Sequence, residues 1–403
     1  MSSQRSALNA LSVVLMVILF VIGIAIGYFV ASSTAPKPTP TTAPVSAPTT
    51  IPVTIPVTTT FTATPTAAAK TPIKIALLLM GAGNPYWDAW AQGVADAVNL
   101  LNSYGIPASY TYFDGKYDPT TQYNQILSAV GAYNVIILTP VDRVGLQSAI
   151  RTAMSQGVYV IVADNAVEDD SLMRPFIGSN NVKAAETEAL ALIQALRESG
   201  KTPPYKILVV HGVTTAANNV LRLMGYVNVL KPLIDNGTVK IVDVQCGCDT
   251  ADKAYSVTLT VLAKTKIDGV LSTNDAQAIG IIRAIKASGL TPGKDVIVVG
   301  LDGIPEAIDA IKAGDMYATV SQAPYVMGFY SVIIAWLHLY FGYEPPADKN
   351  WIVTPTPLVT KANVDTYGYL VKGQFMPPQP TENTRNVKPV SDVNALINTL
   401  KSG

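Results

Sequence analysis

The chain of 403 residues has few of the side chains on which metal and redox chemistry depend. It holds two cysteines, Cys246 and Cys248, and two histidines, His211 and His338. Two cysteines cannot make a disulfide framework, and two sulfurs without a nearby histidine cannot complete a tetrahedral zinc site. The Cys246-Gly247-Cys248 sequence is therefore expected to be structural, either as two thiols or as a local disulfide. No metal and no cofactor are expected.

Charge is scarce and balanced. Charged residues make up 14% of the chain, and 28 Lys+Arg against 28 Asp+Glu give a formal net charge of zero. Such a balance gives no chain-wide attraction to nucleic acid or to an anionic membrane surface. A small neutral partner is expected instead, and nucleic acid is excluded as a partner.

A long apolar run is present at the N-terminus. No charged residue lies between Arg5 and Lys37, and residues 11–30 give about 20 apolar positions, enough to cross a bilayer. The run is longer than that of a secretory signal, so residues 1–33 are predicted to form a retained transmembrane anchor. A cleaved signal and a prepilin-like segment processed near Ala10 remain alternatives. Arg5 on the inner side predicts a single-pass protein of the cell membrane, with its binding domain on the extracytoplasmic face.

Residues 34–72 consist mainly of Thr, Pro, Ala and Val, with 14 Thr and 9 Pro. This composition offers too little apolar surface for a core and too much proline for helix or sheet. A proline-rich chain extends by about 3.1 Å per residue. The segment is therefore predicted to be a Thr/Pro-rich linker that holds the following body away from the membrane.

From Ile73 onward short apolar runs alternate with amphipathic segments, which is typical of a mostly parallel sheet with helices on both faces. Helices are predicted over 85–103 and 275–289, where apolar residues recur at helical spacing. About ten strands in roughly 300 residues need two sheets, so the fold class is α/β with two lobes. The predicted strands are 73–80, 107–113, 134–139, 158–163, 174–178, 206–210, 239–245, 268–272, 295–300 and 316–321.

The C-terminal extension, residues 371–403, begins with a proline-rich stretch. It ends in Ser391-Asp392-Val393 followed by apolar residues at helical spacing. A short capped amphipathic helix is predicted there. No chemistry is assigned to it.

Polar side chains directly follow six of the apolar runs, at the edge of an open parallel sheet where ligands bind. One Asn or Asp at such a place often only caps the next helix, but six together favour a site. Carboxylates accept two hydroxyl hydrogen bonds, amides both donate and accept, and flat aromatic rings cover the C–H side of a sugar. The pattern predicts a site for a polyhydroxylated ligand, built from Asn84, Tyr86, Trp87, Asp164, Asn165, Asn274, Asp302 and Gln322.

Five stretches in this order resemble the type I periplasmic substrate-binding proteins of ABC transporters, in particular the ribose- and galactose-type sugar-binding branch. They are IKIALLLMGAGNPYWDAWAQGVADA, VYVIVADNAV, GVLSTNDAQAIGIIRAI, DVIVVGLDGIPEAIDAIKAGDMYATVSQAPYVMG and TPLVTKANVD. The resemblance implies two Rossmann-like lobes with parallel sheets, joined by three crossovers near Ser179–Asn180, Gln322–Ala323 and 356–358. The implied lobes are 73–179 with 323–356, and 180–322 with 357–370.

The resemblance also implies roles for single residues. Asn84, Tyr86 and Trp87 match first-lobe contacts of the family, and Asp164 matches its sugar-binding aspartate. A further set matches contacts from the second lobe and the hinge: Asn274, Asp302 and Gln322.

Two positions depart from the family pattern. Asn165 stands where many ribose-type members have Arg, and the second-lobe Arg expected in TTAANNVLRLMGY falls at Val220 or Asn219. The resemblance therefore assigns no particular sugar. The candidate replacements are Asn218, Asn219 and Arg222, and Asp249 stands where the family often has an aromatic or polar contact.

The function that this resemblance implies is an extracellular solute-binding protein. It would capture a neutral monosaccharide or polyol between its lobes and deliver it to an ABC permease, with no enzymatic reaction. A receptor that senses a sugar-like signal or a nucleoside for a signalling partner is the alternative. An amino acid would need a cation for its carboxylate, which Arg222 or Arg143 would have to supply.

An enzyme that uses a dinucleotide is the strongest catalytic alternative. Gly81-Ala82-Gly83 follows the first predicted strand, but Tyr86 stands where the G-x-G-x-x-G pattern needs its third glycine. A bulky side chain there blocks the approach of a pyrophosphate. His211 lacks an accompanying nucleophile motif and is expected to be a polar residue at a strand end, and His338 a histidine of an apolar helix.

Overall fold

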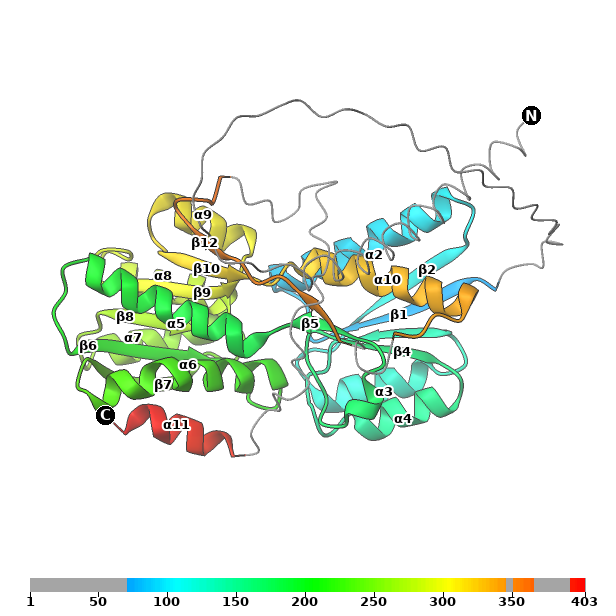
Figure 1. Ribbon diagram of the computed structural model, residues 1–403, viewed down its shortest axis with the longest axis horizontal. Coiled ribbons are helices and arrows are strands. Elements are labelled where there is room, and N and C mark those ends of the chain that lie inside the picture. Colours follow the sequence, from blue (N-terminus) through cyan, green and yellow to red (C-terminus); the bar gives the residue numbers. More distant parts are fainter. Residues whose placement is uncertain (1–70, 346–350, 366–391, 403) are drawn as a thin grey trace, which may run out of the picture. The chain divides into compact units, whose positions relative to one another are not determined.

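Runs of Val, Ile and Leu that are buried on both faces form the centres of two sheets. The computed structural model describes residues 71–345, 351–365 and 392–402. The predicted anchor, 1–33, and nearly all of the predicted linker, 34–72, lie outside the described residues. Both sheets belong to one compact unit, which comprises the described residues from Pro72 onward apart from 103–106 (Figure 1).

The first sheet has the strand order β2-β1-β3-β4-β5-β11, with every neighbouring pair parallel. Its central strands read VIIL and YVIVA and are almost entirely buried, as expected for a sheet covered on both faces. Strand β2 lies at an edge and exposes Tyr110 and Tyr112. The strands are β1 (Ile73–Leu79), β2 (Ala108–Asp114), β3 (Val135–Leu138), β4 (Tyr159–Ala163), β5 (Phe176–Ser179) and β11 (Trp351–Thr354).

The second sheet repeats this arrangement in the order β7-β6-β8-β9-β10-β12. All of its neighbours are parallel except β12, which runs antiparallel to β10. The strands are β6 (Tyr205–His211), β7 (Val239–Cys246), β8 (Gly269–Ser272), β9 (Ile297–Asp302), β10 (Ala318–Ser321) and β12 (Leu358–Thr360). In both sheets the strand order reverses beside the first strand, and parallel sheets bind ligands at that point, beyond the carboxyl ends of the strands.

The helices follow the strands in an alternating α/β pattern. The predicted helix 85–103 is confirmed as α2, and the predicted helix 275–289 as α8, which ends two residues earlier. The described helices are α2 (Pro85–Ser103), α3 (Pro119–Ala129), α4 (Gln147–Ser155), the 3₁₀ turn η1 (Asp170–Leu172), α5 (Asn181–Glu198), α6 (Ala217–Asp235), α7 (Ala251–Leu262), α8 (Asp275–Ala287), α9 (Pro305–Ala313), α10 (Pro324–Phe341) and α11 (Val393–Lys401).

The chain passes between the two sheets three times. It leaves the first sheet after β5, returns after β10, and reaches the second sheet again between β11 and β12. Helix α10 packs on β1, β4 and β5 although it follows a strand of the second sheet. Among the described helices, α10 is long and apolar enough to span a membrane, and 56% of that stretch is buried, so its packing as a core helix explains its composition.

The predicted C-terminal helix is confirmed as α11. Asp392 caps its first turn, accepting a hydrogen bond from the Ala395 amide at 3.0 Å. Leu400 is fully buried in the core of the second lobe, and α11 contacts α6 and β7 (Figure 1, red and green). Lys401 adds an ion pair of 3.1 Å with Asp243 on β7. Helix α11 is therefore part of the second lobe.

Candidate functional site

A small polar pocket lies where the carboxyl ends of the strands of both sheets meet. Its free space is ≈20 Å³, which is room for about one water molecule. The pocket takes its residues from loops after β1, β2, β4, β7, β8 and β10, from the end of β9 and from the first turns of α2 and α6. They are Met80, Asn84, Tyr86, Trp87, Tyr117, Asp164, Asn218, Asn219, Arg222, Asp249, Asn274, Asp302 and Gln322.

The aromatic side of the pocket is set by the start of α2. The Asn84 side chain accepts a hydrogen bond of 3.0 Å from the Tyr86 amide, which fixes the first turn and directs the next two rings inward. The Tyr86 and Trp87 rings meet edge to face at 4.8 Å. Trp87 Nε1 donates a 3.0 Å hydrogen bond to the hydroxyl of Tyr117. The rings of Tyr86, Trp87 and Tyr117 therefore form one wall of the pocket, and the polar atom of each ring takes part in a hydrogen bond.

Asp164 follows β4 in the left-handed region, with φ of 60°. Its side chain is 2% exposed and accepts hydrogen bonds from the Tyr86 hydroxyl at 2.5 Å and from Asn165 Nδ2 at 2.9 Å. Asn165 also accepts a 3.1 Å bond from the Asn218 amide of α6. Asn165 thus links the two lobes by a hydrogen bond and also helps to hold the Asp164 carboxylate in place.

The first turns of α6 bring Asn218, Asn219 and Arg222 into the second-lobe wall. Arg222 is 2% exposed and donates from Nε to the Asn181 side chain at 2.8 Å and from Nη1 to the Thr273 carbonyl. Its Nη2 lies 3.6 Å from Oδ1 of Asp302. The guanidinium is therefore held on one side by the protein and directed at a carboxylate and the pocket on the other.

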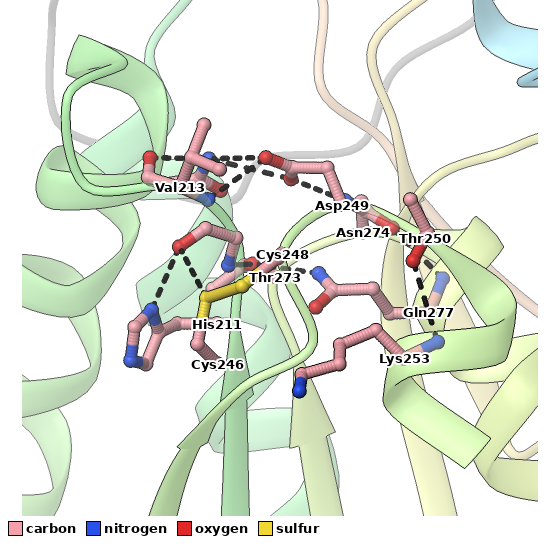
Figure 2. Close-up of a disulfide and its surroundings, with 12 residues drawn as sticks. His211, Val213, Cys246, Cys248, Asp249, Thr250, Lys253, Thr273, Asn274 and Gln277 are labelled. Atoms are coloured by element: carbon pink, nitrogen blue, oxygen red, sulfur yellow. Dashed lines mark hydrogen bonds between the residues drawn. A yellow bond between two sulfur atoms is a disulfide. The ribbon is translucent and has the colours of Figure 1, made fainter. Parts of the chain in front are cut away.

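Asp249 collects amide donors from three elements of the second lobe (Figure 2). It accepts from the Val213 amide at 2.8 Å, from Asn274 Nδ2 at 2.7 Å and from Asn219 Nδ2 at 3.2 and 3.3 Å. Asn274 in turn caps α8 through the Gln277 amide. One carboxylate thereby fixes the orientation of two pocket amides.

The remaining side of the pocket is made by the ends of β9 and β10. Gln322 Nε2 donates to Oδ1 of Asp302 at 2.5 Å. Burial raises the pKa of Asp302 well above its ordinary value because water loss disfavours the charged carboxylate, and Arg222 offsets part of that rise. Burial likewise raises the pKa of Asp164 and Asp249.

Three buried pocket atoms lack a hydrogen-bond partner within the described residues. They are Nη2 of Arg222, Oδ1 of Asn219 and Oε1 of Gln322. A buried polar atom without a partner costs about 1–3 kcal/mol. One donor and two acceptors therefore remain available for the hydroxyl groups of a ligand.

Every residue that the sequence predicts for the site lines this pocket except Asn165, whose side chain is occupied by Asp164, Met80 and α6. Two lining residues were not predicted, Met80 and Tyr117. Met80 directly follows β1, at the strand-end position that the sequence pattern marks. Tyr117 belongs to a loop and is brought in by a left-handed backbone with φ of 52°.

Arg222, the cation that an amino-acid ligand would need, lines the pocket, but the other residues behind the alternative functions do not. A side chain at Gly81 would overlap the Tyr117 ring, so the first glycine of Gly81-Ala82-Gly83 makes room for that ring. Arg143 donates to the carbonyls of Thr214 and Thr215 and does not line the pocket. His211 is buried at the end of β6, and His338 stacks on Tyr159 at 3.6 Å. The described residues contain no group of His, Cys, Asp and Glu that could hold a metal ion.

Comparisons with known proteins agree with this architecture. The pattern of the periplasmic binding protein domain family matches residues 75–342. The D-allose-binding periplasmic protein of Escherichia coli is 29% identical over 261 residues, covering 63% of this chain and 80% of the relative. The D-apiose import binding protein of Paraburkholderia graminis is 30% identical over 296 residues, covering 72% and 88%.

Solved structures give the same result. A solute-binding protein of an ABC transporter from Agrobacterium vitis, with bound D-fucose, aligns with a TM-score of 0.65 and 26% identity over 72% of this chain and 97% of that chain. A galactofuranose binding protein aligns with a TM-score of 0.65 and 21% identity over 73% and 97%. This chain belongs to the periplasmic binding protein family and has its α/β type I fold with two parallel-sheet lobes.

Proposed function

We propose that this protein is an extracytoplasmic solute receptor that captures a neutral monosaccharide or polyol between its lobes and delivers it to an ABC permease. The observation that carries the proposal is the set of buried polar atoms without a hydrogen-bond partner on Arg222, Asn219 and Gln322, beside the rings of Tyr86 and Trp87. Hydroxyl groups satisfy both donors and acceptors, and aromatic rings cover the apolar face of a sugar.

The charges of the pocket support a ligand without net negative charge. Three carboxylates, Asp164, Asp249 and Asp302, face a single guanidinium, Arg222. An anionic ligand would therefore have to compete with Asp302, which lies 3.6 Å from Nη2 of Arg222, for the one guanidinium of the pocket. The names of the relatives, which refer to D-allose and D-apiose, support a sugar.

Binding requires motion, because a monosaccharide is much larger than a space of ≈20 Å³. The three passages between the sheets are suited to act as hinges for closure around a ligand. Delivery to a permease and attachment to the membrane through residues 1–33 belong to the same proposal. They rest on the family and on the apolar N-terminal run.

A ligand panel tests the proposal on the full-length chain. Thermal unfolding is measured with pentoses, hexoses, polyols, nucleosides and amino acids, since a ligand at 100 times its Kd stabilises the folded state by about 2.7 kcal/mol. A shift with a sugar or polyol is expected. A shift with nucleosides or amino acids alone would overturn the proposed ligand class.

Substitution of Asp302 ties any binding to the pocket. Asp302→Ala is expected to weaken sugar binding at least tenfold, the equivalent of about 1.4 kcal/mol. Asp252→Ala is the matched control, because its side chain is 91% exposed on the same lobe. Equal affinities for both variants and the wild type would place the binding site elsewhere.

A further inference from the structure

The Cys246–Cys248 pair forms a disulfide, one of the two states expected from the sequence. It closes a small ring around Gly247 at the end of β7, with 5.0 Å between the two Cα atoms (Figure 2). The next residue along the chain is Asp249, the carboxylate that collects amide donors at the pocket. The disulfide therefore directly precedes, in sequence, a residue of the candidate binding site.

The backbone of this turn is unusual. Cys248 and Asp249 both have positive φ, 50° and 62°, a region that residues other than glycine rarely adopt. The amides of Gly247 and Cys248 both donate to the His211 carbonyl, at 2.9 and 3.3 Å. A conformation of this kind persists only where its surroundings hold it in place. The disulfide is the covalent part of those surroundings.

The turn also packs closely against neighbouring side chains. A side chain at Gly247 would collide with the Gln277 side chain and with Val210. The Thr250 amide donates back to the Gly247 carbonyl at 3.1 Å, and Thr250 then caps α7 through the Lys253 amide. The disulfide, the turn and the start of α7 thus form one continuous support for Asp249.

Through Asp249 this support extends to other pocket groups. The carboxylate accepts from Asn219 and Asn274, which both line the pocket, and from the Val213 amide in the loop before α6. A displacement of Asp249 would release both amides from their present orientation. Asn219 carries one of the unpartnered acceptors of the site.

We propose that the Cys246–Cys248 disulfide is a positioning element of the binding site, which holds Asp249 and through it Asn219 and Asn274 in their ligand-binding orientation. This inference rests on the proposed sugar-binding function. It predicts that breaking the sulfur–sulfur bond weakens sugar binding while the lobes stay folded. It also makes affinity dependent on the redox state of the surroundings.

Reduction with dithiothreitol tests the proposal without a mutation. The dithiol supplies two electrons and two protons, the Cys246–Cys248 bond breaks to two thiols, and the reagent closes to its own cyclic disulfide. Because the chain holds only these two cysteines, any response to the reagent comes from this pair. Both cysteines are partly exposed, so the reagent can reach them.

Affinities for D-allose, D-apiose and D-fucose are measured by calorimetry on the full-length chain before reduction, after reduction and after reoxidation. Reduction is expected to weaken binding of the preferred sugar at least tenfold, and reoxidation to restore it. The Cys246→Ser/Cys248→Ser variant should bind like the reduced protein and should not respond to the reagent. Equal affinity in the oxidised and reduced states would overturn the proposal and leave the proposed function intact.

A thermodynamic cycle separates positioning from a general loss of stability. If the disulfide acts through Asp249, then reduction should have little effect on the affinity of an Asp249→Asn variant. Additive effects of reduction and Asp249→Asn would mean that the disulfide acts elsewhere, which contradicts the proposal. Thermal unfolding of every form shows whether the lobes remain folded.

A readout without sugar covers the case in which none of the three sugars binds. Hydrogen exchange of the Val213 amide, which donates to Asp249, should become at least tenfold faster on reduction, while the amides of the distant strand β3 keep their rates. Unchanged exchange at Val213 would overturn the positioning role. Faster exchange together with no binding of any sugar would retain that role and reject the proposed function.

Discussion

The Tyr86 hydroxyl donates a 2.5 Å hydrogen bond to Oδ1 of Asp164. Asn165 Nδ2 donates to the other oxygen at 2.9 Å, so both oxygens of this buried carboxylate already have a protein donor. The same hydroxyl lies 3.8 Å from the sulfur of Met327 on α10. Tyr86 therefore occupies a position from which a hydroxyl group of a ligand would otherwise reach Asp164.

Tyr86→Phe is expected to change sugar preference. Loss of the phenol frees Oδ1 of Asp164, and a hydrogen bond from a ligand hydroxyl to a charged acceptor contributes about 1.5–3 kcal/mol. The ratio of affinities for a hydroxylated sugar over its deoxy analogue should then rise about tenfold or more. Calorimetry with D-galactose against D-fucose and D-ribose against 2-deoxy-D-ribose measures that ratio.

Tyr112→Phe is the matched control for this prediction, because Tyr112 lies on the edge strand β2 and is 38% exposed. It should leave both ratios unchanged. If Tyr86→Phe also leaves both ratios at the wild-type value, then Tyr86 does not limit access to Asp164.

Arg222→Met is expected to destabilise the second lobe strongly. Arg222 is the cation that faces Asp302, and its removal also takes donors from Asn181 and from the Thr273 carbonyl. Removing one partner of a buried ion pair costs about 3–5 kcal/mol. Urea unfolding of the variant should show a loss of that size.

The control for Arg222 is Arg151→Met. Arg151 pairs with Asp169 at 2.7 Å, but its side chain is 51% exposed, and exposed pairs contribute about 0–1 kcal/mol. A loss below about 1 kcal/mol for both variants would mean that Arg222 is not needed to compensate the buried carboxylates.

Leu400→Ala is expected to lower the free energy of unfolding by about 2–5 kcal/mol, since Leu400 is fully buried against the second-lobe core. Asn398→Ala, on the exposed face of the same helix, should change it by less than about 0.5 kcal/mol. Both values come from urea unfolding followed by circular dichroism. Equal, small effects would show that α11 adds little to the stability of the lobe.

The sheets could be predicted from the sequence because their central strands are apolar on both faces. All ten predicted strands form, with ends shifted by one or two residues. Strands β11 and β12 were not predicted, since WIVT and LVT are short and lie beside Pro355 and Pro357. Three or four residues show no periodicity, and only pairing with the existing sheets makes these segments strands.

Part of the pocket could be predicted from the sequence, because several of its lining residues directly follow predicted strands. Asn84, Asp164 and Asn274 each follow a buried strand, so topology alone brings them to one place. Tyr117 could not be found in this way. Its side chain reaches the pocket because its backbone is left-handed and because Gly81 has no side chain that would overlap its ring. The orientation of Asn165, set by Asp164 beside it, is equally invisible in the sequence.

Asp275 should make stability fall as pH rises through the weakly acidic range. It is fully buried and accepts hydrogen bonds from the amides of Gly303 and Ile304 and from the Thr319 hydroxyl. Burial raises its pKa from an ordinary 3.8 to about 6. The native state therefore keeps a proton that the unfolded state has lost.

The sign of the pH dependence follows from the proton count. Because the folded-state pKa is raised, the contribution of Asp275 to stability is fully present below pH 3.8 and is lost as pH rises through about 6. Where only the native state holds the proton, one such group changes the free energy of unfolding by up to about 1.4 kcal/mol per pH unit. Urea unfolding of the wild type and of Asp275→Asn from pH 4 to 7.5 measures this contribution. The difference between their free energies of unfolding removes the effect of groups that titrate alike in both proteins.

The wild type should lose stability relative to Asp275→Asn across this range. Asp295 provides a control of opposite sign, because hydrogen bonds from Thr291 lower its pKa. Its contribution is present at neutral pH and is lost on acidification, so the wild type should gain stability relative to Asp295→Asn as pH rises from 3 to 5. A difference for Asp275→Asn that stays flat, or that rises with pH like that for Asp295→Asn, would show that burial does not raise the pKa of Asp275 above its ordinary value. The amides of Gly303 and Ile304 and the Thr319 hydroxyl would then be sufficient to offset the burial of its charge.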